Sequence, residues 1–321
     1  MTENRRNSSR VTGSFVGILV GGAGAVFVIR ALVRDWAEVR ATLAGAQAGW
    51  MAAAFVIGMG SMVILALGWS RAMALVGTPA GLRDTLRWYF VGQLGKYVPG
   101  GVWSVVGPAE LATGSRRGRL KAYGGVLLAL GAAYLAAIIT VACLLVLEPG
   151  VVERWAPARW LLAFIPFGVV AVHPRVLELL FAGAGRVLGR PVEIRAPRWR
   201  DSLVLVLCHV PAWLGLGIAT WCVAAGLGAA ASMSEIVLAS ILAWVVGFLV
   251  VPAPGGLGVR EAIFVLAAGS LAGGVGAAVA LVSRVLFVMV DALGALVFGF
   301  GNPMGSGKRS DVPITRRDTE G

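Results

Sequence analysis

Charge is scarce in this sequence, since only 14% of its 321 residues are Asp, Glu, Lys or Arg. A soluble globular domain has roughly a quarter of its residues charged. Six stretches contain no such residue: 11–29, 41–70, 122–147, 202–234, 236–259 and 262–283. Because about 20 apolar residues cross the hydrocarbon core of a bilayer, the chain is predicted to be an all-α, polytopic membrane helix bundle.

Long hydrophilic segments are also lacking. The polar sequence is divided into pieces of about 45 residues or fewer, which is too short for an ordinary soluble catalytic domain. Kinase-like, Rossmann and hydrolase folds are therefore excluded, and the sequence contains no nucleotide-binding motif.

Cysteine and histidine are rare. Cys143, Cys208 and Cys222 lie inside apolar stretches without CxxC spacing, so they are predicted to be buried small hydrophobic residues. His173 and His209 are far apart and lack metal-ligand spacing. We therefore expect no metal and no cofactor.

Basic residues exceed acidic ones and give a formal net charge of +12. They lie between apolar stretches and do not form one stripe with interleaved aromatic residues, so nucleic acid is not an expected partner. Helices are predicted at about 13–33, 48–70, 122–147, 158–173, 202–225, 235–251, 260–273 and 276–301. The sequence leaves open whether 260–273 spans the membrane or re-enters.

The basic residues also predict an orientation. With the N-terminus inside, 20 of them lie in cytoplasmic segments and only four, Arg34, Arg40, Arg154 and Arg159, lie outside. Basic residues mark the cytoplasmic side of membrane proteins. We therefore expect a plasma-membrane protein with both termini in the cytoplasm.

The expected organisation is a single transmembrane domain at 13–301 between two cytoplasmic tails, 1–12 and a disordered 302–321. The first apolar run is too long for a signal-peptide core, so it is predicted to be a retained helix. Residues 174–200 are polar and basic, and they are predicted to form a cytoplasmic interfacial helix followed by a loop against anionic lipid.

Residues 89–111 form the first interrupted apolar element. The predicted topology requires this segment to enter and leave from the same face, and it contains too many glycines and prolines for one continuous helix. A re-entrant hairpin that breaks at Pro99–Gly101 is expected. An amphipathic stretch lying on the membrane surface is the alternative.

Residues 248–264 form a second interrupted element, a broken helix with a similar pattern. Pro99-Gly100-Gly101 precedes Glu110, and Pro254-Gly255-Gly256 precedes Glu261, and the two triplets are offset by 155 residues. This spacing suggests a pseudo-repeat of two halves. Paired breaks of this kind indicate a transporter's substrate site. A half-helix that starts near Arg260 would also direct free N–H groups at the break, which suits a phosphate.

Charged residues within or beside the apolar segments indicate the same region. The cations are Lys96, Arg260 and Arg284, and the acids are Glu110, Glu261 and Asp291. Such residues are costly in lipid and face the protein interior by default. Arg284 and Asp291 share a helix face but are about 10 Å apart along the axis, so they cannot pair directly. Two hypotheses remain: the cations hold an anionic ligand, or these groups form structural ion pairs and snorkel to the interface.

The two elements, GQLGKYVPGGVWSVVGPAEL and VPAPGGLGVREA, resemble the signature regions of the lysylphosphatidylglycerol synthase transmembrane-region family. The resemblance covers roughly residues 10–300 and implies a flippase-like bundle of about eight helices that moves a lipid between leaflets. Together with the charge argument, it gives a candidate substrate-binding set. These residues are Gln93, Lys96, Pro99, Gly100, Gly101, Glu110, Pro254, Gly255, Gly256, Gly258, Arg260, Glu261, Arg284 and Asp291.

Full-length synthases of this family carry an aminoacyl-transferase domain after the membrane part, whereas only about 20 polar residues follow the last predicted helix here. We therefore expect no synthesis of aminoacylated lipid and no enzymatic activity. The leading hypothesis is a flippase-like protein for an anionic or polyprenyl-phosphate lipid. One alternative is a non-transporting partner of an envelope glycosyltransferase or lipid-modifying enzyme, and the other is a membrane-embedded lipid-phosphate enzyme. The oligomeric state is left open.

Overall fold

The computed structural model describes residues 40, 44–97, 116–147, 160–187, 194–249, 256, 258–271 and 273–299. Every regular element in these ranges is helical, which confirms the predicted all-α class. The elements are α3 (Ala48–Leu75), α4 (Leu82–Leu94), the 3-10 helix η1 (Gly95–Tyr97), α6 (Arg116–Leu147), α8 (Trp160–Ala171), α9 (Pro174–Val187), α10 (Trp199–Gly226), α11 (Met233–Leu249), α12 (Val259–Ala267) and α13 (Gly273–Gly299). The predicted first helix at 13–33 and both tails lie outside the described residues.

Four described helices are long and apolar enough to cross a membrane. They are α3, α6, α10 and α13, with spans at Ala48–Leu75, Lys121–Val146, Trp199–Gly226 and Gly274–Gly299. A helix that faces lipid on one side and protein on the other is apolar over most of its surface, which explains the long apolar runs of these four helices. The predicted helices 48–70, 122–147, 202–225 and 276–301 are confirmed.

α8 and α9 form a bent pair. Ile165–Ala171 and Pro174–Gly183 meet at 71°, so the pair counts as a fifth span only if the two are taken together. Pro174 begins α9, a position that proline tolerates well because its missing N–H has no partner in the first turn of a helix. α9 occupies part of the segment predicted to be an interfacial helix.

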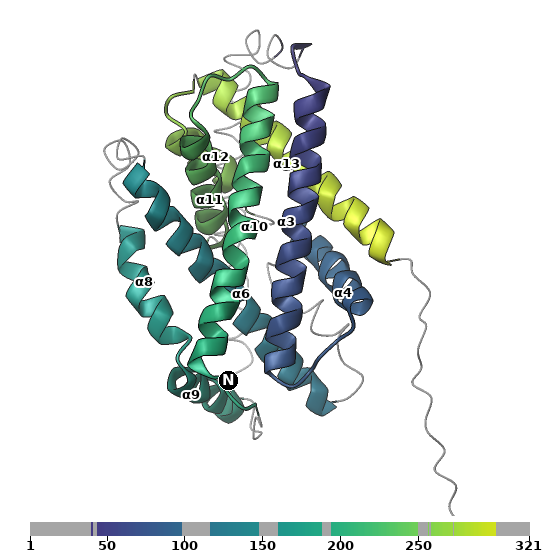
Figure 1. Ribbon diagram of the computed structural model, residues 1–321, viewed down its shortest axis with the longest axis vertical. Helices are drawn as coiled ribbons and strands as arrows, with labels where there is room; N and C mark the ends of the chain where they lie inside the picture. Colours follow the sequence, from purple (N-terminus) through teal and green to yellow (C-terminus); the bar gives the residue numbers. More distant parts are fainter. Residues whose placement is uncertain are drawn as a thin grey trace, which may run out of the picture.

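The bundle has a basic end, defined here as the end where α3 finishes, where α6 and α10 begin, and where α9 lies (Figure 1). Its described cations include Arg71, Arg83, Arg175, Arg198 and Arg200. α10 finishes and α11 begins at the opposite end (Figure 1). The helix termini thus lie at two opposite ends of the bundle, as the charge pattern predicts. That the basic end faces the cytoplasm stays a prediction.

α11 and α12 form a hairpin that enters and leaves from the opposite end. The backbone N–H of Ser270, just past α12, donates to Glu235 Oε1 near the start of α11 at 3.1 Å. α12 has nine residues, so it is only about 14 Å long, less than half of a ~30 Å hydrocarbon core. The segment predicted as a helix at 260–273 is therefore corrected to a helix that ends at Ala267 and re-enters.

α4 reaches the middle of the bundle from the basic end. It begins six residues after α3 finishes, and its 13 residues make it about 20 Å long, which is also too short to span. Its Phe90 ring stacks on Phe298 of α13 with centroids 5.3 Å apart. Residues 98–111 lie outside the described residues, so the return of the predicted re-entrant hairpin stays a prediction.

Small residues allow α3 and α10 to pack closely. A side chain at Gly68 would collide with His209, and one at Gly215 would collide with Ser61. His209 is buried and bonds the Leu205 carbonyl at 2.7 Å, so this histidine has a structural role.

The cysteine prediction is correct at one position and wrong at two. Cys222 is buried, but Cys143 and Cys208 are exposed. Apolar residues on the outer surface of a membrane bundle contact lipid, so position in an apolar stretch does not by itself predict burial in protein.

Candidate functional site

One face of α13 directs polar and charged side chains into the bundle. Ala280, Ser283, Arg284, Phe287 and Asp291 follow the i, i+3, i+4, i+7, i+11 spacing of one helix face. Ser283 is 6% exposed and Asp291 is fully buried. Because lipid cannot solvate these groups, their partners must come from neighbouring helices.

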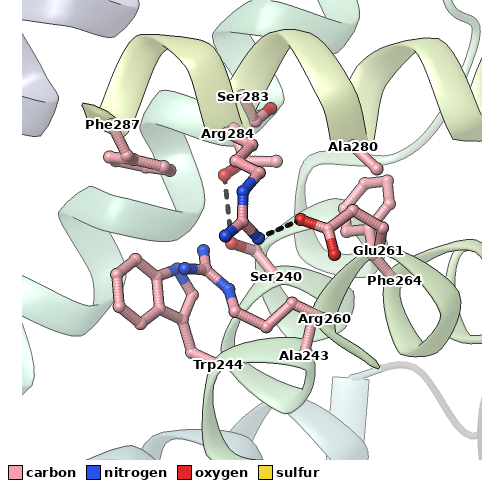
Figure 2. A pocket seen from close by; sticks show the side chains of 11 residues that line it. Ser240, Ala243, Trp244, Arg260, Glu261, Phe264, Ala280, Ser283, Arg284 and Phe287 are labelled. Atoms are coloured by element: carbon pink, nitrogen blue, oxygen red, sulfur yellow. Dashed lines mark hydrogen bonds and ion pairs between the residues drawn. The ribbon is translucent and has the colours of Figure 1, made fainter. Parts of the chain in front are cut away.

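The first partner is Glu261 on α12. One carboxylate oxygen of Glu261 accepts a hydrogen bond from Arg284 in a buried ion pair, shown in Figure 2. The other oxygen accepts the backbone N–H of Gly258 at 2.8 Å. Glu261 therefore caps its own helix. The prediction that the N–H groups at the start of this helix are available to a phosphate is wrong for Gly258.

The second partner is Lys96, which lies in η1 at the inner tip of α4. Its Nζ lies 2.6 Å from Asp291 Oδ2, and it also donates to Gln93 Oε1 at 3.3 Å. The side chains of Lys96 and Asp291 are 14% and 0% exposed. Structural ion pairs, one of the two hypotheses from the sequence, are thus present at both acids of the described site. Arg284 and Asp291 bind different partners, as their spacing predicts.

Trp244 of α11 lies against two of the cations. The guanidinium carbon of Arg260 is 3.5 Å from the centre of the indole, and Lys96 Nζ is 5.4 Å from it. Both distances are within the range of cation–π attraction. Trp244 also makes edge contacts with Trp213 and Phe287, which fix the orientation of its ring.

Two glycines leave room for the Arg260 side chain. A side chain at Gly247 would collide with the Arg260 stem, and a Cβ on Gly256 would lie 3.0 Å from Arg260 Cγ and Cδ. Gly256 also has a φ of +67°, in the left-handed region that favours glycine. Gly258, just before α12, also has a positive φ of +77°, so both described glycines of the predicted break adopt a backbone conformation that favours glycine.

A cavity of about 30 Å³ lies between these helices. Its lining comes from α10, α11, α12 and α13, and most of it is drawn in Figure 2. The lining residues are Thr220, Ser240, Ala243, Trp244, Arg260, Glu261, Phe264, Ala280, Ser283, Arg284 and Phe287. This volume holds about two water molecules, so it is closed to a lipid head group in the conformation shown.

The chemistry of this cavity favours an anion. Its described lining carries two guanidinium groups and one carboxylate. In addition, Ser283 Oγ and Trp244 Nε1 are buried and have no hydrogen-bond partner among the described residues. Both groups can donate, and a buried donor without an acceptor is costly. A ligand rich in acceptor oxygens would satisfy them.

The structure brings together eight of the 14 sequence-predicted residues. Arg260, Glu261 and Arg284 line the cavity, Gly256 and Gly258 shape the break beside it, and Gln93, Lys96 and Asp291 form a polar cluster next to it. Pro99, Gly100, Gly101, Glu110, Pro254 and Gly255 lie outside the described residues.

Sequence reasoning missed Trp244, Ser240, Ser283 and Thr220. Helical spacing was the available signal, because Ser283 lies on the α13 face that carries Arg284, and Ser240 and Trp244 are four apart on α11. Thr220 gave no such signal. It is brought in only by the packing of α10 on α11, where its Oγ1 lies 3.0 Å from Ser240 Oγ.

The fold and the site define a polytopic helical membrane protein with a charged centre between two short helical elements that enter from opposite ends. The chain belongs to the family described as the lysylphosphatidylglycerol synthase TM region, which it matches over residues 14–299. This confirms the resemblance stated above and associates the protein with lipid handling. No curated protein matches the chain.

Proposed function

We propose that this protein moves an anionic, phosphate-containing lipid between the leaflets of the plasma membrane, with the head group passing through the cavity at Arg260 and Arg284. The observation that carries this proposal is the small cavity with two guanidinium groups, one carboxylate and two donors that lack acceptors among the described residues. Arginine binds phosphate oxygens through several N–H groups at once, which makes it well suited to such a head group.

The arrangement of the surrounding helices is consistent with movement of the lipid as well as binding of its head group. The α11–α12 hairpin enters from the opposite end and borders the cavity directly, whereas α4 enters from the basic end and reaches the cavity border through the contact of Lys96 with Trp244 (Figure 1). Because the cavity is too small for a head group, one of these borders must shift to admit a ligand. Alternating shifts of the two borders would expose the cavity to one leaflet at a time.

The proposed orientation places the basic end in the cytoplasm together with both termini. Anionic lipids of the cytoplasmic leaflet attract clustered arginines close to the membrane surface. The cations at the basic end, among them Arg175 and Arg198, would then concentrate anionic lipids at that end of the bundle.

The test is a lipid translocation assay in proteoliposomes with fluorescent phosphatidylglycerol, comparing the wild type with Arg260→Gln. The matched control is Arg40→Gln, which removes an exposed arginine that precedes α3 and is not part of the basic end. A charge-assisted hydrogen bond contributes about 1.5–3 kcal/mol, so Arg260→Gln should slow movement about tenfold or more. The control should move lipid at the wild-type rate.

Equal rates for Arg260→Gln and the wild type would contradict the site. Wild-type vesicles that move lipid no faster than protein-free vesicles would contradict the function. In that second case, co-purification with an envelope glycosyltransferase would favour the scaffolding alternative.

A further inference from the structure

Lys96 contributes to the centre of the bundle differently from the two arginines. It is absent from the described lining of the cavity, whereas Arg260 and Arg284 both belong to it. Its ammonium group is held by Asp291, a fully buried carboxylate on α13. Lys96 therefore differs from Arg260 and Arg284, although the sequence suggested all three as candidate ligands of the head group.

The position of the Lys96–Asp291 pair along the bundle is specific. Asp291 follows Arg284 by seven residues, about 10 Å along α13, on the side where α13 packs against α4. The cavity extends the other way, towards Thr220 and Ser240 near the opposite end. The ion pair therefore lies between the cavity and the basic end.

Trp244 and Phe287 complete this barrier. Both line the cavity, their rings are 5.8 Å apart in an edge contact, and Lys96 Nζ lies against the indole of Trp244. The cavity is thus closed on this side by two aromatic rings with an ion pair beyond them. Lys96 and Asp291 hold the tip of α4 against α13 on the far side of these rings.

We propose that the Lys96–Asp291 ion pair is the gate that closes the cavity towards the basic end. The proposal rests on the proposed function, because it concerns access to the same cavity. When the pair separates, the inner tip of α4 moves away from α13 and the cavity opens to the basic end. The Glu261–Arg284 pair does not close this side, because both of its members line the cavity itself.

The test measures access to a reporter cysteine by a membrane-impermeant thiol reagent applied separately from each side of sealed vesicles. The reporter is Ser283→Cys, because Ser283 lines the cavity and is 6% exposed. The native cysteines Cys143, Cys208 and Cys222 are replaced by alanine so that only the reporter reacts.

Asp291→Asn should raise the rate of reporter labelling from the basic end by about tenfold or more, a typical size for coupling between two states. Lys96→Gln removes the cationic member of the same pair and should have the same effect. It replaces Asp291→Asn if that variant does not fold. The charge-swapped double variant Lys96→Asp, Asp291→Lys should restore slow labelling. Glu235→Gln is the matched control, because Glu235 is a buried carboxylate at the opposite end of the bundle, and it should leave the rate from the basic end unchanged.

The proposal is overturned if neither single variant changes labelling, if the swapped pair labels fast, or if Glu235→Gln has the same effect as Asp291→Asn. The two proposals fail separately. Normal lipid movement with no change in labelling contradicts only the gate, whereas the expected labelling with no lipid movement in the wild type contradicts only the transport function.

Discussion

The two elements that reach the centre of the bundle, α4 from the basic end and the α11–α12 hairpin from the opposite end, present their charges to α13 in opposite order. α4 brings a cation, Lys96, to a carboxylate on α13. α12 brings a carboxylate, Glu261, to a cation on α13. Each element also places a cation on the indole of Trp244.

This reversal gives the two elements different roles. The only cation that α4 brings to this centre is the one bound to Asp291, so its charge serves mainly to hold α4 against α13. α12 carries two neighbouring charges, of which Glu261 holds Arg284 and caps its own helix, while Arg260 extends along the cavity towards Trp244. The charge at the tip of α4 therefore holds two helices together, whereas α12 supplies a charged side chain to the surface of the cavity.

The largest expected effect comes from removing only one member of the Lys96–Asp291 ion pair. Lys96→Met removes the ammonium group from a fully buried carboxylate, and such losses cost about 3–5 kcal/mol. The free energy of unfolding in detergent, measured by denaturant titration, should fall accordingly. The double variant Lys96→Met, Asp291→Leu removes both charges and should regain most of that loss. A double variant as unstable as the single one would show that the pair is not a unit.

A smaller effect is expected at the break that positions Arg260. Gly256→Ala forces a Cβ into a left-handed backbone and against the Arg260 stem, at a cost of about 1–2 kcal/mol in stability. Gly60→Ala is the matched control, because this α3 glycine has open space around it. Thermal unfolding in detergent should show a loss for Gly256→Ala and none for Gly60→Ala. Equal behaviour of the two would contradict the role of the break.

The smallest effect is expected at Trp244, because its indole contacts both Lys96 at the tip of α4 and Arg260 of α12. Trp244→Phe keeps an aromatic ring but weakens a cation–π contact worth about 0.5–2 kcal/mol and removes the buried N–H donor. Lipid movement in proteoliposomes should slow by a few-fold, without the loss expected for Arg260→Gln. Trp160→Phe, at an exposed tryptophan of α8, should have no effect. A tenfold loss at Trp244 would mean that the indole N–H, and not Arg260, dominates binding.

The sequence predicted the long helices well because each needs only a continuous apolar run of sufficient length. It also identified Arg260, Glu261, Arg284, Lys96 and Asp291, since charges inside apolar stretches must face protein or a cavity. It did not predict which acid binds which cation, because pairing depends on where α4 and α12 meet α13 in space. The same limit applies to α12, whose end at Ala267 lies within a run that remains apolar.

Helical spacing contained more information than the charges alone. The face of α13 that holds Arg284 and Asp291 also holds Ser283 and Phe287, so two cavity residues follow from one periodic stripe. Thr220 needed the packing of α10 on α11, which a single sequence does not show. Cavity residues that share one helix face were therefore predictable from the sequence, whereas a residue that only the packing of two helices brings to the cavity was not.

The central claim is that the cavity at Arg260 and Arg284 receives an anionic phosphate head group. The most direct measurement is the amount of phosphatidylglycerol that purified wild type and Arg260→Gln retain after detergent exchange, determined by native mass spectrometry with a neutral diacylglycerol as the reference lipid. Wild type should retain phosphatidylglycerol in preference to the reference, and Arg260→Gln should lose this preference while Arg40→Gln keeps it. Equal retention by wild type and Arg260→Gln would contradict the account.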